Sequence, residues 1–84
     1  MSAHAVWFLG AARRGGNGRF VSRTYLPTIT PADLRTLFPY PADDPLMYNS
    51  YEVTAKQREF LESLTGGILD LERFEYSIEC EASE

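Results

Sequence analysis

The sequence is poor in the residues that cross-link small proteins, because its 84 residues include one cysteine, Cys80. A single cysteine excludes an intramolecular disulfide, and small secreted domains usually depend on such bonds. We therefore expect a cytoplasmic protein. No apolar run approaches the about 18 residues of a membrane-spanning helix. The short apolar stretch near the N-terminus is followed by basic residues, the reverse of the order in a signal peptide.

The same scarcity argues against catalysis. The one histidine, His4, lies far from Cys80 in the chain, and no nucleophile motif surrounds either residue. The acidic residues lack the spacing of a calcium-binding loop, and the glycine-rich segment 15–18 lacks the lysine and hydroxyl residue of a phosphate-binding loop. We therefore predict that the protein is not an enzyme and needs neither a cofactor nor a metal ion.

What the sequence does contain is charge of opposite sign in its two halves. Residues 1–40 hold five arginines and one acidic residue, whereas residues 41–84 hold eleven acidic residues and three basic ones. The formal charge is therefore +4 in the first half and −8 in the second. Such an asymmetry favours a partner that binds through electrostatic attraction.

Alternation of apolar and polar residues predicts an N-terminal β-hairpin. Residues 4–11 are rich in strand formers, the glycines of segment 15–18 tolerate the positive φ of a turn, and residues 19–27 alternate again. In this second strand one face is expected to hold Phe20, Ser22, Thr24 and Leu26, and the other Val21, Arg23 and Tyr25.

Capping signals predict two short helices. Thr30 is a candidate N-cap followed by Pro31, and Thr54 with Gln57 three residues later forms a capping-box pattern whose helix Gly66 would end. A short strand is expected near residues 46–53, and a closing strand from about residue 72 to 82. We expect the core to contain Leu34, Leu37, Phe38, Phe60, Leu61, Leu64, Phe74, Tyr76 and Ile78.

These elements follow one another in the order ββαβαβ. They predict a single α+β domain over residues 1–84, in which two short helices cover one face of a four-stranded, antiparallel-rich sheet.

The closing segment, FEYSIECEASE, predicts a strand with a row of carboxylates on one face. Glu75, Glu79 and Glu81 alternate with the apolar residues, together with Ser77. Neighbouring side chains on one strand face are ~7 Å apart, within the Debye length of ~8 Å. The carboxylates therefore repel one another, and a cationic partner would relieve that repulsion. The alternative is an ordinary solvated face, which antiparallel sheets commonly have.

The loop PADDP extends this acidic character. Asp43 and Asp44 lie close in sequence to Tyr48, and tyrosine is favoured in protein interfaces because it brings a large contact area at low entropic cost. A solvated turn is again the alternative. The predicted partner-binding residues are Asp43, Asp44, Tyr48, Glu75, Glu79 and Glu81. The hairpin arginines, Arg13, Arg14 and Arg19, have no assigned role.

Two segments, DDPLMYNSYEVTAKQREFLESL and LDLERFEYSIECEA, resemble a family of small, poorly characterised bacterial cytosolic proteins. The resemblance covers about the C-terminal half of the chain and leaves out the basic hairpin. Members of such families often look like immunity proteins of toxin–immunity pairs. The matching positions are Asp44, Pro45, Tyr48, Tyr51, Val53, Thr54, Phe60, Leu61, Asp70, Leu71, Phe74, Tyr76, Ile78, Glu79 and Cys80.

The acidic surface and the resemblance together predict a binding protein. The leading expectation is an immunity protein that neutralises a cognate bacterial toxin with a basic surface. The alternative is a nucleic-acid mimic that inhibits or regulates a nucleic-acid-binding machine, such as an anti-CRISPR. A third reading is RNA binding through the arginine hairpin, which the acidic remainder of the chain opposes.

Overall fold

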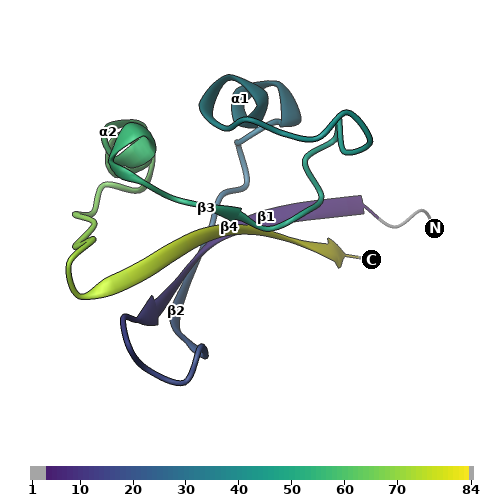
Figure 1. The fold of residues 1–84 in the computed structure, drawn as a ribbon. Helices are drawn as coiled ribbons and strands as arrows, with labels where there is room; N and C mark the ends of the chain where they lie inside the picture. Colours follow the sequence, from purple (N-terminus) through teal and green to yellow (C-terminus); the bar gives the residue numbers. More distant parts are fainter. Residues whose placement is uncertain (1–3, 84) are drawn as a thin grey trace.

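The computed structural model describes residues 4–83, which form a four-stranded antiparallel sheet with two helices on one face (Figure 1). The strand order is β2-β1-β4-β3. The predicted α+β class and the order ββαβαβ are confirmed. The elements are β1 (His4–Arg13), β2 (Phe20–Tyr25), α1 (Pro31–Leu37), β3 (Tyr51–Glu52), α2 (Ala55–Thr65) and β4 (Phe74–Ser83).

The two long strands, β1 and β4, form the centre of the sheet. They pair along their whole length, from His4 opposite Ser83 to Arg13 opposite Phe74. The short strands β2 and β3 flank them as the two edges. Within the described part of the chain, neither helix is long and apolar enough to span a lipid bilayer.

A β-bulge in the hairpin changes which way Phe20 points. Ala11 pairs with Ser22, but Ala12 pairs with Phe20, so one residue of β2 has no partner. An extra residue reverses the alternation beyond the bulge. Phe20 therefore packs edge-on against Phe8, with 5.9 Å between ring centroids, on the face away from the helices. The prediction that Phe20 shares a face with Ser22 was wrong for this reason.

Both predicted helix starts are confirmed. The Thr30 side chain accepts the backbone N–H of Asp33, whose carboxylate accepts the N–H of Thr30 in return. Thr54 and Gln57 form the equivalent capping box at α2. Gln57 also donates its amide N–H to the carbonyl of Leu37, at 2.8 Å, which joins α2 to the end of α1. Gly66 ends α2 in the left-handed conformation, as predicted.

The core lies between the helices and the sheet, and most of the predicted core residues are in it. Leu61 is 0% exposed, but Phe60 is 40% and Leu64 37% exposed, so the prediction was wrong for these two. The reason is the rotation of α2, which buries Gln57 and Leu61, one turn apart. Phe60 therefore lies about 100° around the helix from Leu61.

Candidate partner-binding surface

Within residues 4–83, no helix covers the second face of the sheet, and we call this face the open face (Figure 1). Side chains of paired residues in an antiparallel sheet point to the same side. Phe8 pairs with Tyr25 on β2 and with Glu79 on β4, so these three side chains form one row across the open face. Phe74, Tyr76, Ile78 and Cys80 pack on the helix side. The residues between them, Glu75, Ser77, Glu79 and Glu81, therefore lie on the open face, as the alternation predicts.

The β2 side of the open face is aromatic and cationic. The guanidinium of Arg23 lies over the rings of Phe8 and Phe20, 5.2 and 5.7 Å from their centroids. The ring of Tyr25 is 5.5 Å from that of Phe8. Gly10 makes room for this packing, because a β-carbon there would lie 2.7 Å from the Phe20 ring. The sequence does not predict this cluster, because the bulge moves Phe20 to the opposite face of the sheet from the one that simple alternation gives.

On the β4 side, each predicted glutamate contacts one side chain from another part of the chain. Glu81 accepts the hydroxyl of Tyr25 at 2.7 Å, and this hydrogen bond raises the pKa of the tyrosine. Glu79 accepts the hydroxyl of Ser50. Glu75 lies 3.5 Å from Arg14 in a half-exposed ion pair. Single surface contacts of this kind orient the carboxylates but contribute little free energy.

A shallow hollow of about 240 Å³ lies in the open face, between its aromatic and acidic sides. Glu52 of β3 pairs with Ser77, so Glu52 belongs to this face as well. Sequence reasoning missed Glu52 because β3 is only two residues long and has no alternation to read. The hollow is lined by Ala12, Gly18, Phe20, Glu52, Glu75, Tyr76, Ser77 and Glu79.

Asp44 does not belong to the open surface, which corrects the predicted set. It is 7% exposed and accepts the backbone N–H groups of Tyr48 and Asn49 at 2.9 and 3.0 Å, as well as the hydroxyl of Tyr51. The hydrogen bond from Tyr51 is the main reason that the pKa of Asp44 is lowered. Burial, with the nearby Asp44 carboxylate, raises the pKa of Tyr51 to about 12. Asp44 therefore organises its loop.

Tyr48 lies on the helix side of the sheet and apart from the carboxylate row. Its ring stacks on Trp7, a core residue, at 6.3 Å and an angle of 21°. The indole N–H of Trp7 donates to the carbonyl of Met47, at 2.9 Å, which fixes the loop beneath Tyr48. Asp43 is exposed in the same loop. The structure thus divides the predicted residues between two surfaces.

Arg14 has a structural role that the sequence did not indicate. Its guanidinium donates two hydrogen bonds to the carbonyl of Leu71, at 2.9 and 3.2 Å, and its backbone N–H donates to the carbonyl of Arg73. These bonds attach the connection between α2 and β4 to the hairpin. Arg13 and Arg19 are exposed. If the hairpin bound RNA, Arg13 and Arg19 would supply most of the contacts, because the Arg14 guanidinium is already engaged.

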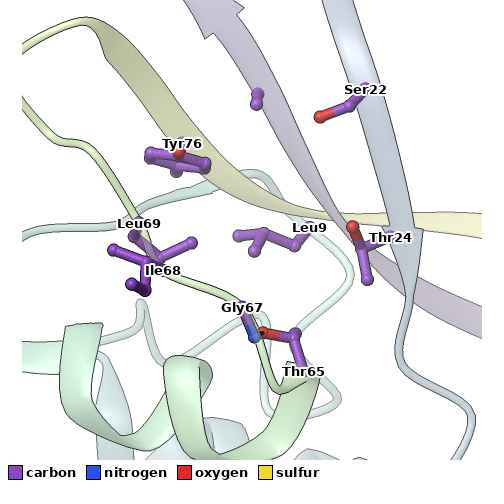
Figure 2. Close-up of a pocket in the computed structure, with 9 residues that line it drawn as sticks. Leu9, Ser22, Thr24, Thr65, Gly67, Ile68, Leu69 and Tyr76 are labelled. Atoms are coloured by element: carbon purple, nitrogen blue, oxygen red, sulfur yellow. Dashed lines mark hydrogen bonds between the residues drawn. The ribbon is translucent and has the colours of Figure 1, made fainter.

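A second hollow, of about 210 Å³, lies on the helix side between β2 and the chain that leaves α2 (Figure 2). Leu9 and Tyr76 contribute apolar surface to it, while Ser22, Thr24 and Thr65 contribute hydroxyl groups. Among the residues 4–83 that the structure describes, those that line this hollow carry no charged side chain. This hollow therefore offers nothing that would select a basic partner, in contrast to the one on the open face.

A family model described as a domain of unknown function, DUF7683, matches residues 15–79. The match is wider than the expected resemblance, because it begins within the glycine-rich turn and includes β2. No curated protein matches the chain. No solved structure matches it either.

Proposed function

The chain belongs to the DUF7683 family, whose function is unknown, and we propose that it is a non-enzymatic protein that binds a basic protein partner on the open face of its sheet. The observation that carries this proposal is the placement of Glu52, Glu75, Glu79 and Glu81 on one uncovered face. A cationic partner surface would complement these groups, which lie on one face as neighbouring like charges in the unbound protein, with Arg14 beside Glu75 alone.

The magnitudes indicate what kind of interface this is. Two carboxylates ~7 Å apart repel each other by only about 0.6 kcal/mol in water, before screening by salt. Relief of this repulsion cannot supply a tight complex by itself. The aromatic groups beside the carboxylates, Phe20 and Tyr25, supply contact area, while the charges steer the partner and select it.

The partner that fits best is a bacterial toxin domain, which makes the protein an immunity protein. An immunity protein needs a surface that recognises one toxin and no chemistry of its own, and the acidic open face fits a toxin with a basic surface. The resemblance expected from the sequence of the C-terminal half points to the same function, whereas the DUF7683 family itself has no known function. A gene for a secreted toxin directly upstream of this gene would support it further, and co-expression with that toxin should restore growth.

A nucleic-acid mimic remains the second candidate, since a row of carboxylates can imitate phosphates. Arg23 lies on the same face, however, and interrupts the uniformly negative surface that such a mimic presents. This observation favours a protein partner of mixed character. A phage or mobile-element context for the gene, and inhibition of a nucleic-acid-binding enzyme by the purified protein, would favour mimicry instead.

The direct test is to isolate the partner and measure the complex with purified components. The tagged protein is used as bait in its native host, and each candidate partner is then produced separately. We expect the dissociation constant to rise with salt, because the attraction between exposed charges is screened. Binding to Glu59→Lys, on the exposed side of α2, should remain as tight as binding to the parent. A partner whose affinity does not depend on salt would contradict the proposal.

A further inference from the structure

The hollow on the open face combines a small floor, an aromatic wall and an acidic wall. Ala12 and Ser77 form the floor. Phe20 of β2 stands on one side, because it pairs with Ala12. Glu52 of β3 lies on the other side, because it pairs with Ser77. At about 240 Å³, the hollow has room for several waters of about 30 Å³ each, and therefore for a side chain.

The acidic wall offers several carboxylates to one occupant. Glu75 and Glu79 are the neighbours of Ser77 along β4, and Glu52 is its neighbour across the sheet, so the three glutamates surround Ser77. Within residues 4–83, Glu52 has no hydrogen bond or ion pair with another side chain. Within the same range, no group of three such residues is close enough to hold a metal ion. The carboxylates are thus spread around the hollow.

The aromatic wall already binds a guanidinium. Arg23 of this chain lies over Phe20 with 5.7 Å between its guanidinium carbon and the ring centroid, yet Arg23 does not line the hollow. A planar guanidinium stacks on aromatic rings and donates hydrogen bonds to more than one carboxylate at once, which the compact ammonium of lysine does less well. The ring and the spread carboxylates therefore suit arginine.

From this charge complementarity we propose that the partner anchors itself on the open face by inserting an arginine side chain into the hollow. The guanidinium packs beside Phe20, and its N–H groups donate to Glu52 and Glu79. The ion pair between Arg14 and Glu75 stays in place at the rim. This inference rests on the proposed function, since it names the chemical group by which the basic partner is recognised.

The test uses small probes and does not depend on finding the partner. The ¹⁵N-labelled protein is titrated at low salt with N-acetyl-arginine methylamide, and separately with the citrulline and lysine derivatives. Citrulline has nearly the same shape as arginine but no charge. We expect the arginine probe to shift the amide signals of Ala12, Ser77 and Glu52, with an affinity at least tenfold above that of citrulline and threefold above that of lysine.

Variants locate the bound probe. Glu52→Gln/Glu79→Gln should weaken the arginine probe at least fivefold, and Phe20→Leu at least threefold, while Glu59→Gln on α2 should leave its affinity unchanged. The amide spectrum of each variant also shows whether the fold is intact, and Glu79→Gln alone serves if the double variant fails to fold. Equal affinity for arginine and citrulline, equal affinity for lysine, or shifts elsewhere on the protein would overturn the inference.

The arginine anchor and the proposed function can be refuted independently of each other. A basic partner that binds the parent and loses affinity for Glu79→Lys/Glu81→Lys, together with an arginine probe that does not enter the hollow, would refute the arginine anchor alone. An arginine probe that binds as expected, together with a partner that is indifferent to charge reversal on the open face, would refute the proposed function alone.

Discussion

Truncating Leu61 to alanine should destabilise the protein more than truncating its larger neighbour, Phe60. Leu61 is 0% exposed between α2 and the sheet, whereas Phe60 is 40% exposed on the outer side of the same helix. Replacing a buried leucine by alanine costs about 2–5 kcal/mol, because transfer free energy is lost and a cavity remains. A fully buried position such as Leu61 should cost about 3–4 kcal/mol on that scale.

The cost at Phe60 is smaller for a calculable reason. Burying a phenylalanine side chain completely contributes about 1.5–3 kcal/mol. With 40% of the residue exposed, roughly 60% of this value, about 1–2 kcal/mol, is at stake. Water fills the space that alanine leaves at a surface position, so little cavity cost is added. The two free energies of unfolding should differ by about 2 kcal/mol.

Urea denaturation measures this difference. For a denaturant slope of about 1.2 kcal/mol per molar, Leu61→Ala should lower the midpoint by about 2.5–3.3 M and Phe60→Ala by about 0.8–1.7 M. The one tryptophan, Trp7, is buried and reports unfolding by its fluorescence. Ser63→Ala, exposed on α2, is the control and should change the midpoint little. Equal midpoints for the two truncations would contradict this facing of α2, and a larger loss for Phe60→Ala would mean that α2 is rotated by about 100°.

Three further perturbations test the packing and the ionisable groups. Gly10→Ala should lower stability by about 1–3 kcal/mol, because its new β-carbon displaces the Phe20 ring; an unchanged melting temperature would contradict this packing. The pKa of Tyr51 is raised from 10.0 to about 12, so between these pH values the folded state keeps a proton that the unfolded state loses. The free energy of unfolding should therefore fall from pH 10 to 12, and Tyr51→Phe should flatten that decline. The pKa of Asp44 is lowered mainly by the hydrogen bond from Tyr51, so the free energy of unfolding should fall as the pH drops below about 4. The same loss of stability at low pH in Asp44→Asn would refute this.

The features that the sequence predicts correctly depend on interactions between residues close in the chain. Thr54 and Gln57 cap α2 through bonds that span three residues, and Gly66 ends it through its own backbone conformation. The alternation of β4 is likewise local, so the facing of Glu79 followed from the sequence once the strand was assigned. These features can therefore be predicted without knowing the rest of the fold.

The features that the sequence does not predict depend on long-range packing. The bulge at Ala12 arises in the pairing of two strands, and it turns Phe20 to the open face. The facing of α2 was misjudged because the buried side includes the polar Gln57, whose amide is satisfied by a carbonyl at the end of α1. A polar residue at a core position weakens the apolar pattern from which a helix face is read.

The residues of the candidate surface also divide into those placed by local sequence and those placed by long-range packing. Three of its glutamates, Glu75, Glu79 and Glu81, could be placed from the alternation of one strand. Asp44 was misassigned because its burial depends on Tyr51 and on two backbone groups of a folded loop. Glu52 joins the surface only through the pairing of β3 with β4. The acidic character of the surface was therefore predictable, whereas its aromatic wall and its hollow were not.

The central claim is that the open face binds a basic protein, and the affinity of the purified complex tests it most directly. Titration calorimetry at low salt would compare the parent with Glu79→Lys/Glu81→Lys and with the control Glu59→Lys, after thermal melting has shown that all three fold. Opposing like charges cost several kcal/mol at an interface, and about 1.4 kcal/mol corresponds to tenfold in affinity. We predict that the double reversal weakens binding at least a hundredfold while the control binds as the parent does. Equal affinities for all three proteins would contradict the claim and leave the carboxylate row as a solvated face.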